Sequence, residues 1–190
     1  MPNYTLTART PLDGFSHDFN GVSVTEVNGR SIVSIATSLG GGEALSKALA
    51  KTYKLKIPEP GKSTVSSLDN AVLLGMAQDQ TFLVFDDHTE DKPVDVVSKH
   101  LKDTAYFTDQ SDSYVMLRVS GENSRSVLER ICPIDLHPSV FPEGSVSRTI
   151  MEHLGTVIVH EKANTFLLMS ARSSAKSFLE AVEVSALNIG

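Results

Sequence analysis

The chain has 190 residues, of which 41% are hydrophobic and 21% charged. This composition is that of a globular protein long enough to bury a core without disulfides or metals. Seventeen Lys and Arg against 23 Asp and Glu give a net charge of −6, and neither sign forms a long block. These features argue against nucleic acid as a partner, since phosphate binding needs clustered cations.

No segment of the sequence predicts a membrane or secretory route. The longest apolar run, near residues 71–77, is far shorter than the roughly 18 residues that a membrane span needs. Residues 1–5 lack the basic and apolar regions of a signal peptide. We therefore expect a cytoplasmic protein of one domain or two small fused ones, with no membrane partner.

The first part of the chain predicts strands before a helix. Residues 1–20 have no hydrophobic period and indicate an extended N-terminal arm. Residues 22–26 and 30–36 predict two strands, and Asn28-Gly29 between them predicts a hairpin. Residues 43–53 then have the apolar spacing of an amphipathic helix.

Two further apolar runs, at residues 71–77 and 81–85, predict antiparallel strands before a helix that begins at Pro93. The second half repeats this order. It has a predicted strand at 114–119 and a helix that ends at Cys132, because the residue before a proline disfavours the helical conformation. After a loop at 133–144, three strands and a final helix are predicted near 147–152, 156–160, 165–169 and 175–182.

Three landmarks recur at nearly constant separation and suggest an internal duplication: Gly40 with Gly121, Gly61 with Gly144, and residues 81–83 with 165–167. The predicted organisation is an arm at 1–20, a first half at 21–104 and a second half at 105–190, forming one pseudo-duplicated unit. The halves could share one continuous sheet or pack as a pseudo-symmetric pair. Helices should lie mainly on one side of each sheet.

Phosphate-binding and dinucleotide-binding motifs are missing or incomplete. Residues 59–64 end like a P-loop, but Lys56 stands where that motif needs its first glycine, so a turn is the simpler interpretation. Gly40-Gly41-Gly42 precedes a helix that could bind an anion at its N-terminus, or the glycines could only allow a tight connection. There is no Gly-x-Gly-x-x-Gly turn and no Gly-x-Ser-x-Gly elbow.

Histidine and cysteine spacing does not predict a metal site or a nucleophile. No two of the six histidines stand four residues apart, as they would to share one helix face. His88 with the acidic residues between Asp86 and Asp91 could form a loose site, although such a loop is usually only solvated. Cys132, the single cysteine, is predicted to be a buried structural thiol.

A resemblance to a known family rests mainly on the second half. Residues 118–138 read RVSGENSRSVLERICPIDLHP, and the likeness continues through 140–149, 151–155 and 165–175. This sequence resembles the gamma subunit of heterotetrameric bacterial sarcosine oxidase. That family is in turn similar to aminomethyltransferases, whose strand, Ser-Gly, helix and proline-loop pattern recurs from Arg118 to Pro142.

The resemblance implies an α+β fold of two similar βαββα-type halves with antiparallel or mixed sheets, like the N-terminal folate-binding domain of aminomethyltransferases. It also implies a complex with alpha, beta and delta subunits that oxidises sarcosine to glycine, forms hydrogen peroxide and transfers the one-carbon unit to tetrahydrofolate. FAD, FMN, NAD, tetrahydrofolate and zinc are expected on the other subunits. This chain is expected to be a structural subunit without catalytic, cofactor-binding or metal-binding residues.

Five residues are candidates for contact with a partner. Ile134, Leu136 and Phe141 lie in the proline-bearing loop, where they would expose apolar surface unless they close the core of this chain. Arg118 and Arg148 fall on predicted strands, where an arginine points outward or pairs with a carboxylate. Both arginines are candidate interface anchors.

Two other functions compete with the subunit role. A stand-alone folate-binding protein of one-carbon metabolism is the main alternative, although the Lys-Gly-Cys-Tyr-type motif of related folate-binding proteins is not matched around Cys132. A free-standing homodimer is the other, since an exposed arm and a hairpin edge could mediate self-pairing.

Overall fold

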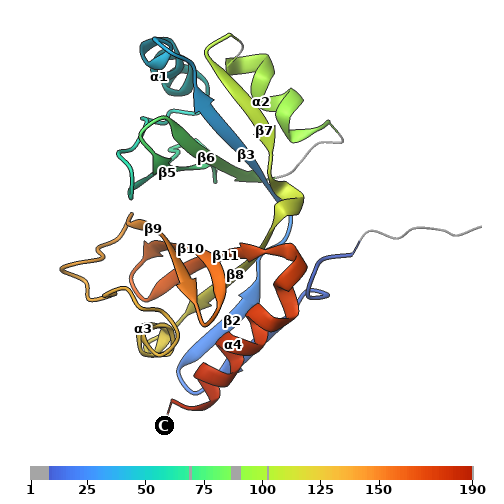
Figure 1. The fold of residues 1–190 in the computed structure, drawn as a ribbon, viewed down its shortest axis with the longest axis vertical. Helices are drawn as coiled ribbons and strands as arrows, with labels where there is room; N and C mark the ends of the chain where they lie inside the picture. The colour runs from blue at the N-terminus through green and yellow to red at the C-terminus, as the bar shows by residue number, and fades with distance from the viewer. Residues whose placement is uncertain (1–8, 69, 87–90, 102, 190) are drawn as a thin grey trace, which may run out of the picture.

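The protein consists of two antiparallel sheets that stack face to face, with helices on the outer face of each (Figure 1). The computed structural model describes residues 9–68, 70–86, 91–101 and 103–189. No helix within these residues is long and apolar enough to cross a membrane. The α+β class predicted from the sequence is confirmed, and both sheets are wholly antiparallel.

Sheet A has six strands, in the spatial order β1 (Ser16–Phe19), β2 (Val22–Glu26), β8 (Tyr114–Ser120), β11 (Thr165–Ala171), β10 (Leu154–Lys162) and β9 (Val146–Met151). Helices α3 (Ser124–Glu129) and α4 (Ala175–Leu187) cover its outer face. A 3₁₀ turn at Arg172–Ser174 precedes α4. Phe166, Phe178 and Val182 are completely buried between this sheet and its helices.

Sheet B has five strands, in the spatial order β4 (Ser63–Val65), β5 (Val72–Ala77), β6 (Gln80–Asp86), β3 (Arg30–Thr37) and β7 (Ala105–Asp109). Helices α1 (Gly42–Thr52) and α2 (Pro93–Leu101) pack on its outer face. A second 3₁₀ turn, Ser111–Ser113, joins β7 to β8. The apolar faces of these two helices are buried against the sheet, through Leu45, Leu49, Val97 and Leu101.

A third apolar cluster lies between the two sheets. Alternate residues of one strand face opposite layers, so Ile32 packs between the sheets while its neighbour Val33 packs under the helices. Central strands buried on both faces read as continuous apolar runs, such as residues 166–169. The other buried members of the inner cluster are Leu74, Phe82, Val84, Met116, Val146, Val157, Val159, Leu167 and Met169.

The hairpin predicted around Asn28-Gly29 is wrong, although both strands are confirmed. β2 pairs with β1 and β8 in sheet A, whereas β3 pairs with β6 and β7 in sheet B. Gly29 has a φ of +69° in the segment that crosses between the sheets. The hairpin that opens the fold is β1 with β2, around a second Asn-Gly pair, Asn20-Gly21.

The predicted N-terminal arm is also corrected within the described residues. Residues 1–8 lie outside them, but β1 occupies residues 16–19 and pairs with β2. The buried carboxylate of Glu26 accepts hydrogen bonds from Thr10 Oγ1 at 2.8 Å, Leu12 N at 3.0 Å and Gly14 N at 2.7 Å. These bonds fix the segment before β1 to sheet A.

Most other predicted elements are confirmed within one or two residues, including antiparallel β5 and β6 and helices α1 and α2, whereas helix α4 extends five residues beyond the predicted stripe at 175–182. Helix α3 ends at Glu129, three residues before the predicted end at Cys132. The amides of Ile131 and Cys132 instead both bond to Leu128 O in a turn. β4 and β7 are short edge strands with few buried side chains, and the sequence does not predict them.

The register of the strands relates the two halves. β5 and β10 have irregularities at corresponding places, between Gly75 and Ala77 and between His160 and Lys162. Gly61 and Gly144 both have positive φ, and each half bonds to the other, with Ser63 N to Gly144 O at 2.7 Å and Val146 N to Gly61 O at 2.8 Å. This arrangement is that of a pseudo-two-fold axis and favours the duplication inferred from the sequence.

Two details of the proposed duplication differ in the structure. The strand pairing makes Phe82 equivalent to Leu167, since both face the inner cluster, so the predicted match of residues 81–83 with 165–167 is displaced by one residue. Moreover, the leading strand of each half belongs to the other half's sheet: β2 lies in sheet A and β7 in sheet B. The sheets therefore cross the predicted division between residues 104 and 105.

Candidate functional site: a cleft between the two sheets

A cleft of about 800 Å³ opens at one end of the interface between the sheets. Its apolar walls come from β5 and β6 of sheet B and from β10 and β11 of sheet A, through Leu74, Val84, Val159 and Leu167. The loop that contains Glu143 and Gly144 lines the cleft together with β4. Clefts of this size are typical of binding sites.

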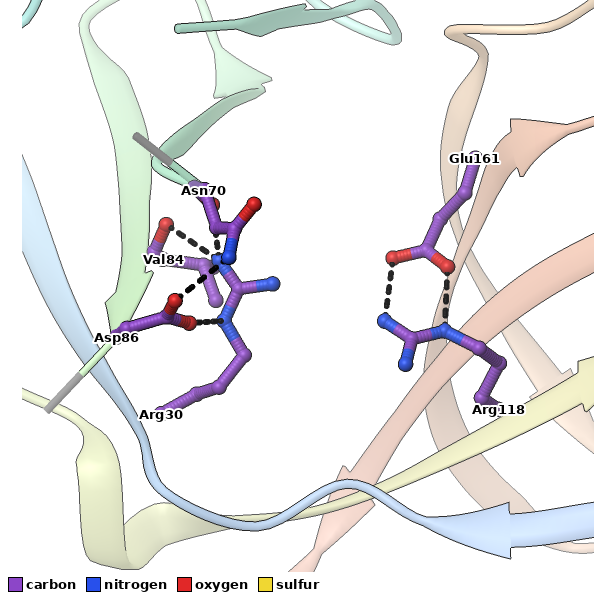
Figure 2. Close-up of polar contacts among 6 residues, drawn as sticks. All are labelled: Arg30, Asn70, Val84, Asp86, Arg118 and Glu161. Atoms are coloured by element: carbon purple, nitrogen blue, oxygen red, sulfur yellow. Dashed lines mark hydrogen bonds and ion pairs between the residues drawn. The ribbon is translucent and has the colours of Figure 1, made fainter. Parts of the chain in front are cut away.

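On the sheet B wall, Arg30 is held by three neighbours (Figure 2). Its Nε lies 3.3 Å from Asp86 Oδ1, and its Nη2 donates to Val84 O at 3.2 Å and to Asn70 O. Asn70 Nδ2 donates to the other carboxylate oxygen of Asp86 at 2.8 Å. Arg30 and Asp86 are direct partners in the β3–β6 register, which explains why they meet.

On the sheet A wall, Arg118 forms a two-pronged pair with Glu161 (Figure 2). Arg118 Nε donates to Glu161 Oε2 at 2.7 Å and Nη2 donates to Oε1 at 3.0 Å. Arg118 lies on β8 and Glu161 on β10, so the ion pair reaches across β11, the strand between them. Hydrogen bonding to Glu161 and its negative charge raise the pKa of Arg118, although partial burial acts in the opposite direction. The arginine stays charged wherever the chain is folded.

The charges that line the cleft cancel. Three cations, Arg30, Arg118 and Lys162, face three anions, Asp86, Glu143 and Glu161. The four residues drawn in Figure 2 as two ion pairs face each other across the gap, each pair within its own sheet. A neutral cleft with apolar walls suits an uncharged group that can both donate and accept hydrogen bonds.

The opposite end of the inter-sheet interface is different. A smaller cavity of about 430 Å³ lies at that end of sheet A and is lined by Tyr114 and Ala171, the register equivalents of Arg30 and Asp86. Arg148, from β9, reaches across to sheet B, where its guanidinium carbon lies 5.7 Å from the centre of the Phe82 ring. Its Nη2 also donates to Gln80 Oε1 at 3.3 Å. An arginine side chain thus links the two sheets at this end, whereas at the cleft the two halves meet through Ser63 and Gly144.

The two candidate arginines therefore have different surroundings. Arg118 lines the cleft and binds Glu161, which matches the predicted pairing with a carboxylate. Arg148 is exposed and connects the two sheets through its contact with Phe82. The structure does not bring these two side chains together in one site, and their roles at a partner interface stay predictions.

The candidate loop residues lie against sheet A. Leu136 is completely buried, Phe141 is 8% exposed, and Ile134 is partly buried against the same core. The Phe141 ring stacks on His160, which in turn stacks on Phe166. These side chains close the core of this chain, which is the alternative arrangement considered from the sequence. Among the loop's large apolar residues, Val140 is the exposed one, at 59%.

The described residues contain no group of three or more His, Cys, Asp or Glu that could hold a metal ion. The predicted loose site at His88 falls in residues 87–90, outside the described part of the chain. Cys132 is 6% exposed, and its Sγ lies 4.0 Å from Thr149 Oγ1. Burial of this thiol agrees with the predicted structural role.

Arg30 and Glu161 were not predicted from the sequence as site residues, and Asp86 was considered only for the loose site around His88. Their ion pairs join strands far apart in the chain; Arg118 and Glu161 are 43 residues apart. The available signal was the alternation of side chains along a strand. In β3 it places Arg30 on the same inner face as Ile32, where an isolated charge needs a partner.

Comparisons with known proteins place the chain in a family. No curated protein matches the sequence. The structure is similar to heterotetrameric sarcosine oxidase from Corynebacterium sp. U-96 in complex with pyrrole 2-carboxylate, with a TM-score of 0.79, 17% identity, and 94% of each chain covered. It is also similar to glycine cleavage system aminomethyltransferase T from Bartonella henselae, with a TM-score of 0.65 and 15% identity over 85% of this chain and 45% of that one.

The structural likenesses confirm the predicted fold, including its relation to aminomethyltransferases. A model of the sarcosine oxidase, gamma subunit family matches residues 41–186, which is most of the chain and extends well into the first half, beyond the segments that carried the resemblance. The chain thus belongs to the sarcosine oxidase, gamma subunit family.

Proposed function

We propose that this chain is the small accessory subunit of a cytoplasmic heterotetrameric sarcosine oxidase, where it assembles with alpha, beta and delta subunits. The complex would oxidise sarcosine to glycine, release hydrogen peroxide and transfer the one-carbon unit to tetrahydrofolate. The observation that carries this proposal is the match of residues 41–186 to the gamma subunit family. The similarity of fold over 94% of a chain of a heterotetrameric sarcosine oxidase supports it.

Within that complex we assign this chain a structural role in assembly, with FAD, FMN, NAD, tetrahydrofolate and zinc held by the other subunits. The arrangement of the cleft supports this division. The carboxylate of Glu161 is engaged by Arg118 through both oxygens, and Asp86 by Arg30 and Asn70. Contacts to both oxygens fix each carboxylate within its own sheet, as in a structural ion pair.

The experiment that tests the proposal is a pull-down of the tagged chain from its native cell. We expect larger chains to co-purify, with flavin absorbance and sarcosine-dependent peroxide formation in the same fraction. A matched pull-down of an untagged strain controls for nonspecific capture. A lone, colourless chain that binds tetrahydrofolate would contradict the subunit role and favour the stand-alone folate-binding function, whereas a lone homodimer without folate would favour the third possibility.

A further inference from the structure

The charged residues of the cleft have no charged counterpart at the opposite end of the pseudo-two-fold arrangement. Strand register and the paired irregularities of β5 and β10 define the equivalent positions. Arg30, Asp86, Arg118 and Glu161 correspond to Tyr114, Ala171, Ser34 and Met76. Both halves share the same succession of strands and helices, so the architecture does not require charge at these four positions.

The two ends of the interface also differ in the side chain that could span the gap between the sheets. At the opposite end Arg148 spans the two sheets, but the equivalent residue at the cleft is Val65, which is too short to do so. Arg30 and Arg118 each bind a carboxylate of their own sheet. The cleft between the two walls has a volume of about 800 Å³ and is lined by residues of both sheets.

The chemistry of the walls restricts what can enter. Both guanidinium groups are neutralised, so an anion would gain little and would lose its hydration. Each ion pair offers a donor beside an acceptor, which is the complement of a peptide group, with its own N–H and C=O. Val84 and Val159, both buried, form the apolar floor of the cleft, and the less buried Val72 and Val65 supply apolar surface nearer its mouth for a side chain.

The apolar surface continues from the cleft onto its rim, which points to a macromolecule. Val65 lines the cleft and is 66% exposed, and Leu68, in the segment between Val65 and Asn70, is 64% exposed. Exposed apolar surface rimmed by polar residues is typical of protein interfaces, and arginine is enriched at their centres. A solute enclosed by the cleft would leave these rim residues in water.

We propose that the inter-sheet cleft receives an extended, uncharged apolar segment of another subunit, with its peptide groups against the Arg30–Asp86 and Arg118–Glu161 pairs. This inference rests on the proposed function, since it names where the complex engages this chain. The neutrality of the cleft determines the chemistry of the segment. Charged side chains in it would be buried without a free partner.

A labelling experiment tests where the segment binds. Cys132 is replaced by Ala, and Val65→Cys is introduced in that background; Ile150→Cys, 54% exposed on β9 away from the cleft, is the matched control. A maleimide should modify both cysteines at similar rates in the isolated full chain. In the purified complex we expect the rate at Val65→Cys to fall by on the order of tenfold or more, with Ile150→Cys serving to normalise reagent access.

A substitution experiment tests the same site by blocking it. Val65→Arg places an arginine at the mouth of the cleft, equivalent to Arg148, which bridges the sheets at the opposite end. Because Val65 is exposed, the variant should fold normally. We expect Val65→Arg to weaken assembly on the order of tenfold or more, whereas Ile150→Arg, a matched substitution at the exposed control position on β9, should leave assembly within about twofold. Thermal unfolding checks that both variants are folded.

The outcomes separate the two proposals. If the wild-type chain captures no larger chains, the proposed function is wrong. If the wild type assembles but Val65→Cys reacts equally fast in the complex, or Val65→Arg assembles normally, the cleft is not the binding site. Protection already present in the isolated chain would also overturn the inference, because a second copy or a bound solute would then occupy the cleft, and native mass would distinguish these.

Discussion

Gly75 and His160 occupy equivalent positions in the two halves. The amide of Gly75 donates to Lys62 O at 2.8 Å, and the amide of His160 donates to Ser145 O at 2.9 Å. The carbonyl oxygens of Gly75 and His160 in turn accept hydrogen bonds from glycine amides, from Gly61 N at 2.9 Å and from Gly144 N at 2.8 Å respectively. One backbone frame therefore accommodates a glycine in one half and an imidazole in the other.

The glycine is required in the first half because the chain lies too close for a side chain. A Cβ on Gly75 would meet Glu59 O at 2.3 Å. We expect Gly75→Ala to lower the free energy of unfolding by about 1–3 kcal/mol, as overpacking of a tight site does. Urea denaturation measures the change.

The matched control for this substitution is Gly155→Ala, because a Cβ at Gly155 has nothing within 4 Å. Its free energy of unfolding should stay within about 0.5 kcal/mol of the wild type. Equal stability of Gly75→Ala and the wild type would mean that the segment around Glu59 moves away freely, against the tight packing described here.

His160 is accommodated because the longer loop of the second half covers it. Its Nδ1 bonds to Phe141 O at 2.9 Å, and its ring lies between Phe141 and Phe166. Removing one ring from this buried stack leaves a cavity, so we expect Phe141→Ala to destabilise the chain by about 3–5 kcal/mol. Urea denaturation of the isolated chain is the measurement.

Val140→Ala is the control for Phe141→Ala, since Val140 is 59% exposed in the same loop. Its effect on the free energy of unfolding should be within about 0.5 kcal/mol. The contradictory result is a Phe141→Ala chain as stable as the wild type that no longer assembles, which would place Phe141 at the partner interface.

Glu26 secures the segment before the first hairpin, so its removal should release that segment. We expect Glu26→Ala to lower the free energy of unfolding by about 1–3 kcal/mol, because three donors lose a buried carboxylate acceptor. Trypsin should also cleave after Arg9 faster in the native variant than in the wild type. The exposed Glu122→Ala is the control, and an unchanged cleavage rate in Glu26→Ala would show that other contacts hold the segment.

Sequence patterns predicted the elements better than their partners. The apolar spacing of Leu45 and Leu49 or of Val97 and Leu101 identifies a helix face wherever that helix packs. By contrast, Asn28-Gly29 signals a reversal of the chain but does not determine which strand lies beside β2. Here β8 provides the stabilising cross-strand contacts, and the chain crosses to the other sheet.

The ion pairs of the cleft could not be predicted from the sequence either, because they too depend on which strands lie side by side. Arg118 was recognised as a strand arginine that needs a carboxylate, but any of 23 acidic residues could have supplied it. The choice of Glu161 depends on the irregularity between His160 and Lys162 and on the order β8, β11, β10, both of which are tertiary features. The resemblance to a family, in comparison, needed only the local run from residue 118.

Cys132 offers a last test, because its burial predicts an unreactive thiol. At 6% exposure, and beyond the end of helix α3, it has neither the access nor the helix N-terminus that activates a cysteine. We expect a thiol reagent to modify the native chain only at the rate of unfolding, and urea to expose one thiol per chain. Cys132→Ala should keep full sarcosine turnover in the assembled complex, at a cost of roughly 1 kcal/mol in stability. Rapid modification of the native thiol, or loss of turnover by a folded and assembled Cys132→Ala complex, would give this chain a part in the chemistry.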